Sequence, residues 1–343
     1  MEQHEITQTG PLLDEHGNLR EPGYARKPLP IYERHKAKGG PLRIKEWDYY
    51  LVMNGQCALG LTIADNSYMG LDSISLIDFW EKRQTTRSPV RLLPMGSTGM
   101  PCSSQKGDSA TRGKGYSLLF RREEDRRLLY AHMENFEGKD GLDAYLELTG
   151  EPEESMVICT PFDKPGHFYF NQKINCLRAK GKVTLGEREY MFDPADSFGV
   201  LDWSRGVWTY RSTCYWASAS GLVDGVPFGL NLGYGFGNTA AATENMLFYD
   251  GKAHKLDKVR FRIPGRKRKR RYLDLWEITS GDGRLELEFK PLLERNSCTG
   301  LGPLRSNQHQ IFGHFTGLVV LDSGEELFLK DLLGFAEEVE NRW

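Results

Sequence analysis

Residues 198–208 read FGVLDWSRGVW, and residues 213–234 read TCYWASASGLVDGVPFGLNLGY. Within the second stretch, Asp224-Gly225 is a two-residue hairpin signal, because the central positions of a type I′ turn need positive φ. Counting outward from this turn predicts three cross-strand pairs, Ser220–Gly229, Ser218–Asn231 and Trp216–Gly233. Because side chains alternate along strands, these six residues share one face of the hairpin.

The two faces of this hairpin differ in kind. The face just described is small and polar, with one indole. The opposite face is apolar and suits a packed core; it holds Tyr215, Ala217, Ala219, Leu230, Leu232 and Tyr234. Small residues on the polar face leave room for something to approach. A ligand could fill that space, and so could a loop, the N-terminal part of the chain or another strand; the residues alone leave this open.

The rest of the chain has the profile of β-sheet. Its 343 residues include 37 Gly, 7 Trp, 15 Tyr and 17 Phe. Rings suit pleated surfaces and glycines suit tight turns. Hairpin signals recur at short spacing, as at Asn54-Gly55, Asp250-Gly251, Asp282-Gly283 and Ser323-Gly324. This pattern predicts an all-β fold of antiparallel strands closed into barrels or sandwiches.

The length suits two packed domains. We expect an extended lead-in over residues 1–41, one β-domain over 42–193 and a second over 194–343. Residues 71–82 fit either a strand or a short helix, and residues 332–340 predict a short C-terminal helix.

Composition argues against several classes of protein. The net charge of −2 gives no global reason to expect nucleic acid or an anionic membrane as partner. Residues 1–10 lack the apolar core of a signal peptide, and no run approaches the roughly 18 apolar residues that span a bilayer. The six cysteines form no CxxC pair, so neither a zinc site nor a disulfide framework is indicated. A cytoplasmic protein without membrane span, metal or cofactor is the expectation.

One run of like charge stands out at residues 266–271, RKRKRR. It could be a nucleic-acid or nuclear-import patch. A solvated hairpin tip is the favoured interpretation, because the remainder of the chain is not basic and no stacking aromatics are interleaved.

Groups capable of acid–base chemistry flank the hairpin. Asp202 and Arg205 precede it, and Glu244 and Asn245 follow it. A carboxylic acid in an apolar cavity has a raised pKa and can donate a proton near neutrality. The structural alternative is a buried Asp202–Arg205 ion pair that fixes a strand corner, and Glu244 or Asn245 could equally tie down the glycine-rich loop 235–243.

These stretches resemble a bacterial family of unknown function, the domain of unknown function 2804. The resemblance rests on FGVLDWSRGVW (198–208), on the hairpin with the GYGFGN and ATENMLFYDG stretches that follow, and on HQIFGHFTG (309–317) and GFAEEVENRW (334–343). It covers most of the chain after about Leu42. More distantly, the pattern is similar to lipocalin-like hydratases and cyclases, among them carotenoid 1,2-hydratase, kievitone hydratase and AttH-like proteins. Asp202 and Trp216 fall where that group carries an acidic element and a Trp-containing hairpin, although Asp-Trp-Ser-Arg stands here in place of Asp-Arg-Glu-Trp.

The resemblance implies two lipocalin-like (calycin) domains packed together with a pocket in or between them. It implies a cofactor-independent hydratase, isomerase or cyclase acting on a small organic molecule. We expect Asp202 and Glu244 to be catalytic. The residues expected to bind substrate are Arg205, Trp208, Tyr210, Trp216, Ser218, Asn231, Tyr234 and Asn245.

Three alternatives stay open: a glycoside-active enzyme with paired carboxylates, a non-catalytic carrier of a lipid or apolar ligand, and a purely structural protein. A carrier should have an apolar cavity without a convergent carboxylate. An enzyme should have Asp202 or Glu244 reaching open space beside Trp216.

Overall fold

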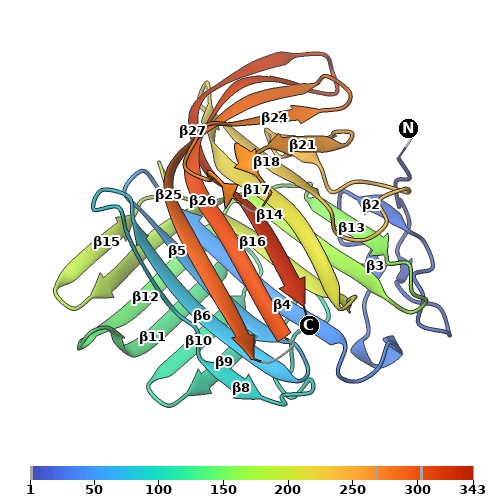
Figure 1. Ribbon diagram of the computed structural model, residues 1–343, viewed down its shortest axis with the longest axis horizontal. Coiled ribbons are helices and arrows are strands. Elements are labelled where there is room, and N and C mark those ends of the chain that lie inside the picture. The colour runs from blue at the N-terminus through green and yellow to red at the C-terminus, as the bar shows by residue number, and fades with distance from the viewer. Residues whose placement is uncertain (1–2, 268, 302–303, 343) are drawn as a thin grey trace.

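The computed structural model describes residues 3–267, 269–301 and 304–342. Almost all of its regular structure is antiparallel strand, arranged in two large sheets that pack against each other (Figure 1). The described residues hold one short 3-10 turn, Arg34–Lys36, and no helix long and apolar enough to cross a membrane. The expected all-β, lipocalin-like architecture is confirmed.

The first sheet follows the path β7-β6-β5-β4-β16-β14-β12-β11-β10-β9, with β2, β8, β13 and β15 paired along its sides. Its strands are β2 Gly23–Ala25, β4 Ile44–Met53, β5 Cys57–Asp65, β6 Met69–Asp78, β7 Arg83–Arg87, β8 Val90–Leu92, β9 Ser109–Gly113, β10 Tyr116–Arg122, β11 Arg127–Glu137, β12 Asp140–Thr149, β13 Met156–Pro161, β14 Phe168–Leu185, β15 Arg188–Phe192 and β16 Phe198–Val207. A separate small pair, β1 Gly10–Pro11 and β3 Pro30–Ile31, lies in the lead-in.

This sheet curls around its own apolar core. Tyr50, Val52, Leu61 and Trp203 are among the side chains packed inside it. Side chains rather than a ladder link β7, at one end of the sheet, to β11 near the other end, since Glu137 of β11 accepts hydrogen bonds from Thr85 and Arg83 of β7. Apolar side chains therefore fill the interior of the first sheet.

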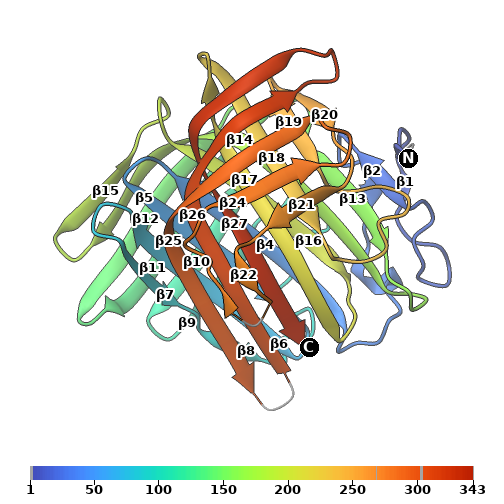
Figure 2. The ribbon, with the colours of Figure 1, turned by 45° about the horizontal axis from the view of Figure 1, so that its top comes forward.

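The second sheet follows the path β20-β19-β18-β17-β27-β26-β25-β24-β21 and packs one face over a second apolar core (Figure 2). Its strands are β17 Arg211–Val223, β18 Val226–Tyr234, β19 Met246–Tyr249, β20 Lys252–Lys255, β21 Val259–Arg262, β24 Trp276–Ser280, β25 Leu285–Leu301, β26 Leu304–Val320 and β27 Glu326–Arg342.

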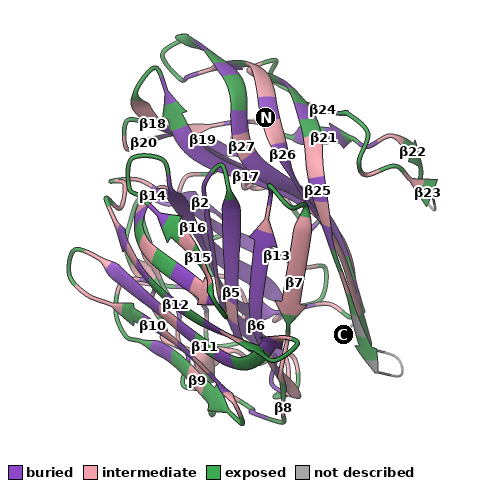
Figure 3. Cartoon of the chain, turned by 90° about the vertical axis from the view of Figure 1, so that its left-hand side faces the viewer, coloured by how far each residue is buried: buried purple, intermediate pink, exposed green. Residues whose placement is uncertain are grey.

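The basic run forms an exposed hairpin, β22 Gly265–Arg266 and β23 Lys269–Arg270, which projects from the second sheet (Figure 3). Arg268 lies outside the described residues. A hairpin tip in this run is what the sequence favoured.

The register of the β17–β18 hairpin is the predicted one. Ser220 pairs with Gly229, Ser218 with Asn231, and Trp216 with Gly233. The apolar face also packs as expected, with Ala217, Ala219, Leu230 and Leu232 in the second core.

The predicted C-terminal helix at 332–340 is wrong. These residues belong to β27, a central strand bonded to β17 on one side and β26 on the other. Ladder bonds on both edges and burial on both faces, unbroken from Gly334 to Val339, outweigh the helical preference of Ala-Glu-Glu. Residues 71–82, which left helix and strand open, lie largely in β6.

The chain passes from the first sheet to the second between Val207 and Arg211. From the sequence alone, the second domain is expected to start at residue 194. Every residue of β16 is buried, because this strand lies at the centre of the first sheet between β4 and β14. The division into two domains remains an interpretation, with the change of sheet at residues 208–210.

Part of the polar hairpin face is covered by protein. A bulge in β14 places Asn175 and Cys176 over it, and Cys176 has φ +62°. The Asn175 amide donates to Ser218 Oγ at 2.9 Å and to Ser220 Oγ at 3.3 Å. At this end of the hairpin, a strand of the first sheet therefore occupies the space that the small residues leave.

Gly229→Ala tests how tightly this bulge fits. A Cβ at Gly229 would lie 2.8 Å from Cys176 Sγ and 3.0 Å from Asn175 Cβ. We expect the free energy of unfolding in urea to fall by about 1–3 kcal/mol, as overpacking costs in other cores. Gly55→Ala is the control, because nothing lies within 4 Å of its Cβ. Equal stability of the two variants would contradict this packing.

Candidate functional site

A cavity of about 480 Å³ lies between the two sheets. It is bounded by the outer face of β4, β5, β6, β14 and β16 and by the polar face of β17, β25, β26 and β27. This volume is in the range of roughly 300–1,000 Å³ found for small-molecule sites. A row of cross-strand neighbours runs through each wall.

The wall from the first sheet is the row Lys173–Asp202–Tyr49–Thr62–Ser73. These residues are paired in sequence across β14, β16, β4, β5 and β6. All five line the cavity. Side chains alternate between the two faces of a strand. The residues before and after each member of this row, such as Leu201 and Trp203 beside Asp202, therefore point into the first core.

The facing wall is the row Gly233–Trp216–Glu337–Gln310–Arg295 across β18, β17, β27, β26 and β25. The two rows touch. Lys173 Nζ lies 4.2 Å from the centre of the Trp216 ring, and the Gln310 amide donates to the Tyr49 hydroxyl at 3.4 Å. The cavity therefore depends on both sheets being in place.

An ion pair between Lys173 and Asp202 lies at the centre of the first wall. Lys173 Nζ is 2.9 Å from Asp202 Oδ1, and the two side chains are 3% and 9% exposed. Asp202 also accepts hydrogen bonds from the Asn171 amide and, at 3.2 Å, from Trp47 Nε1. A buried ion pair with several added hydrogen bonds offsets much of its desolvation cost, so the Asp202 side chain is held in place at the cavity surface.

Glu244 reaches the same cavity from the loop before β19. Its carboxylate lies directly over Gly233, where a Cβ would be only 2.5 Å from Oε1. The accessible part of the side chain lines the cavity. Burial raises the pKa of Glu244, while Lys173 and a hydrogen bond with Asn231 act in the opposite direction. Glycine at position 233 thus admits a protonatable carboxyl group beside Trp216.

Glu337 is a third acidic group in the cavity. Its pKa is raised to about 7, chiefly by burial and also by the nearby Asp202 carboxylate, although Gln308, Arg295 and Lys173 act to lower it. Gln308 donates to Glu337 Oε2 at 2.8 Å. A carboxyl group with a pKa near 7 exchanges its proton readily at neutral pH, as a general acid must.

Aromatic rings form the end of the cavity nearest the lead-in. Trp47 and Trp208 meet edge to face at 4.2 Å between ring centres, and Phe236 lies 4.9 Å from Trp208 and 4.7 Å from Tyr169. Burial and the nearby Glu244 and Asp202 carboxylates raise the pKa of Tyr169 well above its usual value. This end can accept an apolar ligand and can stabilise positive charge on it.

Four of the residues expected from the sequence line the cavity: Asp202, Glu244, Trp208 and Trp216. Two others support it from behind. Asn231 accepts a hydrogen bond from Trp216 Nε1 at 2.7 Å and donates to the Glu244 carbonyl, while Asn245 accepts from the Gly233 amide at 2.7 Å. Asn231 fixes the indole, and Asn245 ties the following loop to the strand.

The remaining expected residues lie outside the cavity. Arg205 is three positions from Asp202 and so points to the opposite face of β16, where it pairs with Asp48 at 3.0 Å inside the first sheet. Ser218 lies under Asn175, Tyr234 stacks on Tyr215 on the apolar side of the hairpin, and Tyr210 is surface-exposed beside Arg211. The Asp202–Arg205 ion pair that was the structural alternative does not form, because Asp202 pairs with Lys173.

Sequence reasoning missed Lys173, Glu337 and Arg295. In residues 168–175, Tyr169, Asn171, Lys173 and Asn175 share one face, and the other face is apolar apart from Gln172. A polar face on an otherwise apolar strand was the available signal for Lys173. Glu337 was hidden by the mistaken helix, and nothing near Arg295 distinguishes it.

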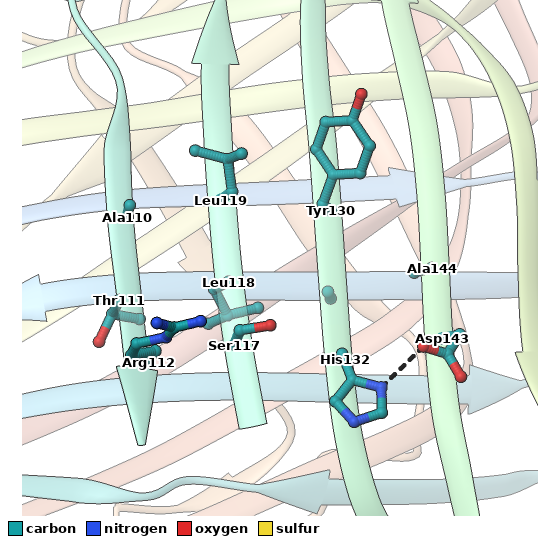
Figure 4. Close-up of a pocket in the computed structure, with 11 residues that line it drawn as sticks. Ala110, Thr111, Arg112, Ser117, Leu118, Leu119, Tyr130, His132, Asp143 and Ala144 are labelled. Carbon is teal, nitrogen blue, oxygen red and sulfur yellow. Dashed lines mark hydrogen bonds and ion pairs between the residues drawn. The ribbon is translucent and has the colours of Figure 1, made fainter. Parts of the chain in front are cut away.

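A second hollow lies on the outer surface of β9–β12 (Figure 4). His132 and Asp143 pair there at 2.7 Å, with side chains 46% and 71% exposed. It holds no buried charge, so we take the cavity between the sheets as the candidate site. Among the described residues, no group of three or more His, Cys, Asp or Glu side chains is arranged to hold a metal ion.

Solved structures with the same fold cover nearly the whole chain. CghA with Sch210972 is 14% identical, with 96% of this chain and 97% of that chain covered and a TM-score of 0.51. An AttH-like protein from Nitrosomonas europaea is 12% identical, with 91% and 98% covered and a TM-score of 0.55. Kievitone hydratase from Nectria haematococca is 12% identical, with 92% and 94% covered and a TM-score of 0.49. At these identities the likeness to the first two structures concerns the fold alone.

No curated protein matches the sequence. A family model does, over residues 3–343, and this span contains both walls of the cavity. The chain therefore belongs to the family described as Domain of unknown function (DUF2804).

Proposed function

We propose that this protein is a cofactor-independent acid–base enzyme of the hydratase, isomerase or cyclase type. Its substrate would be a small, largely apolar organic molecule bound between the sheets. One observation carries the proposal: Asp202, Glu244 and Glu337 converge on a single aromatic cavity around Lys173.

The three carboxyl groups suit different steps. Glu337, with a pKa of about 7, is the proposed proton donor. Transfer of its proton to an alkene carbon forms a C–H bond and leaves a cation, which the faces of Trp208 and Trp216 can stabilise. Asp202, paired with Lys173, then accepts a proton from an attacking water or from the adjacent carbon. Glu244 is the alternative donor, because its pKa is also raised.

The alternatives fit the cavity less well. A carrier of apolar ligands has no need of buried carboxyl groups, whose desolvation costs stability. A glycoside-active enzyme would use two of these carboxyl groups and an aromatic platform, so it stays the second candidate. The product of a hydratase differs in mass from its substrate by one water, and the product of an isomerase or cyclase has the same mass as its substrate. A glycosidase instead releases a free sugar.

The first test is to identify the ligand that co-purifies by native mass spectrometry and to follow its conversion in buffer without added cofactor. We expect Glu337→Gln and Asp202→Asn each to lower kcat by about 10²–10⁴. Thr62→Val, which changes an uncharged cavity residue of similar volume, should stay within about threefold of the wild type. Full turnover by both carboxyl variants would exclude the assigned roles.

The pH profile separates the two candidate donors. If Glu337 is the acid, kcat falls as the pH rises through about 7, because the group loses its proton there. This decline should vanish in Glu337→Gln. A decline that persists in Glu337→Gln and vanishes in Glu244→Gln would transfer the role to Glu244.

Glu337 also predicts a stability change that needs no substrate. Its folded pKa of about 7 lies above its usual value of 4.5, so the folded state binds the proton more tightly. Its contribution is complete below pH about 4.5 and is lost as the pH rises through about 7. Relative to wild type, Glu337→Gln should therefore gain roughly 3 kcal/mol between pH 5 and pH 8 in urea denaturation. A constant difference between the two proteins would contradict the raised pKa.

The Lys173–Asp202 pair can be tested by a double-mutant cycle. Lys173→Met leaves a buried carboxylate without its cation and should lower the free energy of unfolding by about 3–5 kcal/mol. Adding Asp202→Asn removes that charge and should recover much of the loss. Additive effects of the two substitutions would show that the groups are not coupled.

A further inference from the structure

An exposed apolar segment borders the cavity at β8. Residues 90–95 read VRLLPM, and four of them are exposed although apolar: Val90 46%, Leu92 83%, Leu93 63% and Met95 42%. Val90 and Leu92 also line the cavity, so the exposed patch is continuous with its interior. Contiguous exposed apolar side chains usually mark an interaction site.

The segment is held in this outward position. The Leu93 amide donates to the Tyr68 carbonyl at 3.1 Å and the Met95 amide to the Ser67 carbonyl at 3.0 Å. Leu93 and Met95 have φ of +48° and +51°, a conformation that is costly for bulky side chains. Arg91, which follows Val90, points inward instead, and its Nε lies 2.8 Å from Asp72 Oδ2. The apolar side chains are therefore presented to solvent by a fixed backbone.

Arginines gather at the same end of the molecule. Arg305 of β26 also lines the cavity. It pairs across strands with Arg342 of β27, and Arg342 pairs in turn with Arg211 of β17. Figures 1 and 2 show β8, the start of β26 and the end of β27 at one end of the structure. One carboxylate, Glu340, lies beside the three guanidinium groups. Like charges directly opposed across strands are destabilising, which an anionic partner would relieve.

We propose that this end of the molecule docks on an anionic phospholipid bilayer. Leu92, Leu93 and Met95 would enter the interface, and Arg305, Arg342 and Arg211 would meet the lipid phosphates. An apolar ligand could then pass between bilayer and cavity without crossing water. The overall charge of −2 gives no such attraction, so the local arginines supply it. This docking proposal depends on the exposed surface around the cavity mouth, and it does not depend on the catalytic function proposed above.

The test is flotation of the full chain with vesicles of phosphatidylcholine alone and of equimolar phosphatidylcholine and phosphatidylglycerol. The main variant is Leu93→Asn with Met95→Asn. Asparagine tolerates positive φ better than leucine or methionine, so this variant should fold at least as well as the wild type. Neither position lines the cavity.

We expect the wild type to float with the mixed vesicles, less so as salt rises, and the double variant to partition roughly tenfold more weakly. Arg305→Gln with Arg342→Gln should weaken binding several-fold to the mixed vesicles only. Leu273→Asn is the matched control, because Leu273 is 59% exposed but lies after the basic hairpin. It should float like the wild type.

Three results would overturn the proposal. The wild type could fail to float, the double variant could float equally well, or only Lys267→Glu with Lys269→Glu in the basic hairpin could abolish flotation. Fluorescence of 1-anilinonaphthalene-8-sulfonate in solution reports the cavity separately. If the double variant keeps this signal and its Tm but loses flotation, the docking surface is supported whatever the outcome of the turnover tests.

Discussion

The buried ammonium of Lys173 is the interaction on which the site depends. It lies 2.9 Å from Asp202 and 4.2 Å from the Trp216 ring centre, so it joins a carboxylate of the first sheet to an indole of the second. It also acts electrostatically on Glu244 and Glu337, whose pKa values it lowers against the effect of burial. Without this cation, three acidic groups would face each other in one poorly hydrated cavity. The lysine therefore makes it possible to hold several carboxyl groups in the same space.

Both curled sheets have apolar interiors, and the candidate cavity lies between the sheets rather than inside either one. The polar and charged side chains of the candidate site lie on the outer faces of the two sheets, where these faces meet. Apolar clusters on either side of the cavity, around Trp208 and around Phe335, hold those faces together. The site is thus an interface inside one chain rather than the inside of a barrel.

Sequence reasoning succeeded where the physical signal is local. The Asp224-Gly225 turn fixed a register that the structure reproduces, and alternation separated the two faces of that hairpin correctly. It failed where tertiary context decides. Residues 332–340 have the local pattern of a helix but form part of a central strand. Arg205 lies on the face of β16 opposite to Asp202, because side chains alternate along the strand. Lys173 and Asp202 are 29 positions apart, and no local pattern states that β14 and β16 are neighbours.

The central position of β16 also has a consequence for how the chain folds. The strands β4 to β7 form one run of local hairpins, and β9 to β12 with β14 form another. Among the described strands, β16 alone links the two runs by ladder hydrogen bonds, by inserting between β4 and β14. Until it does, two partial sheets have open edges, and contacts that span about 150 residues are slow to form. Open edges of this kind invite association between chains, so the interval before β16 inserts is when this protein is most vulnerable to aggregation and most in need of a chaperone.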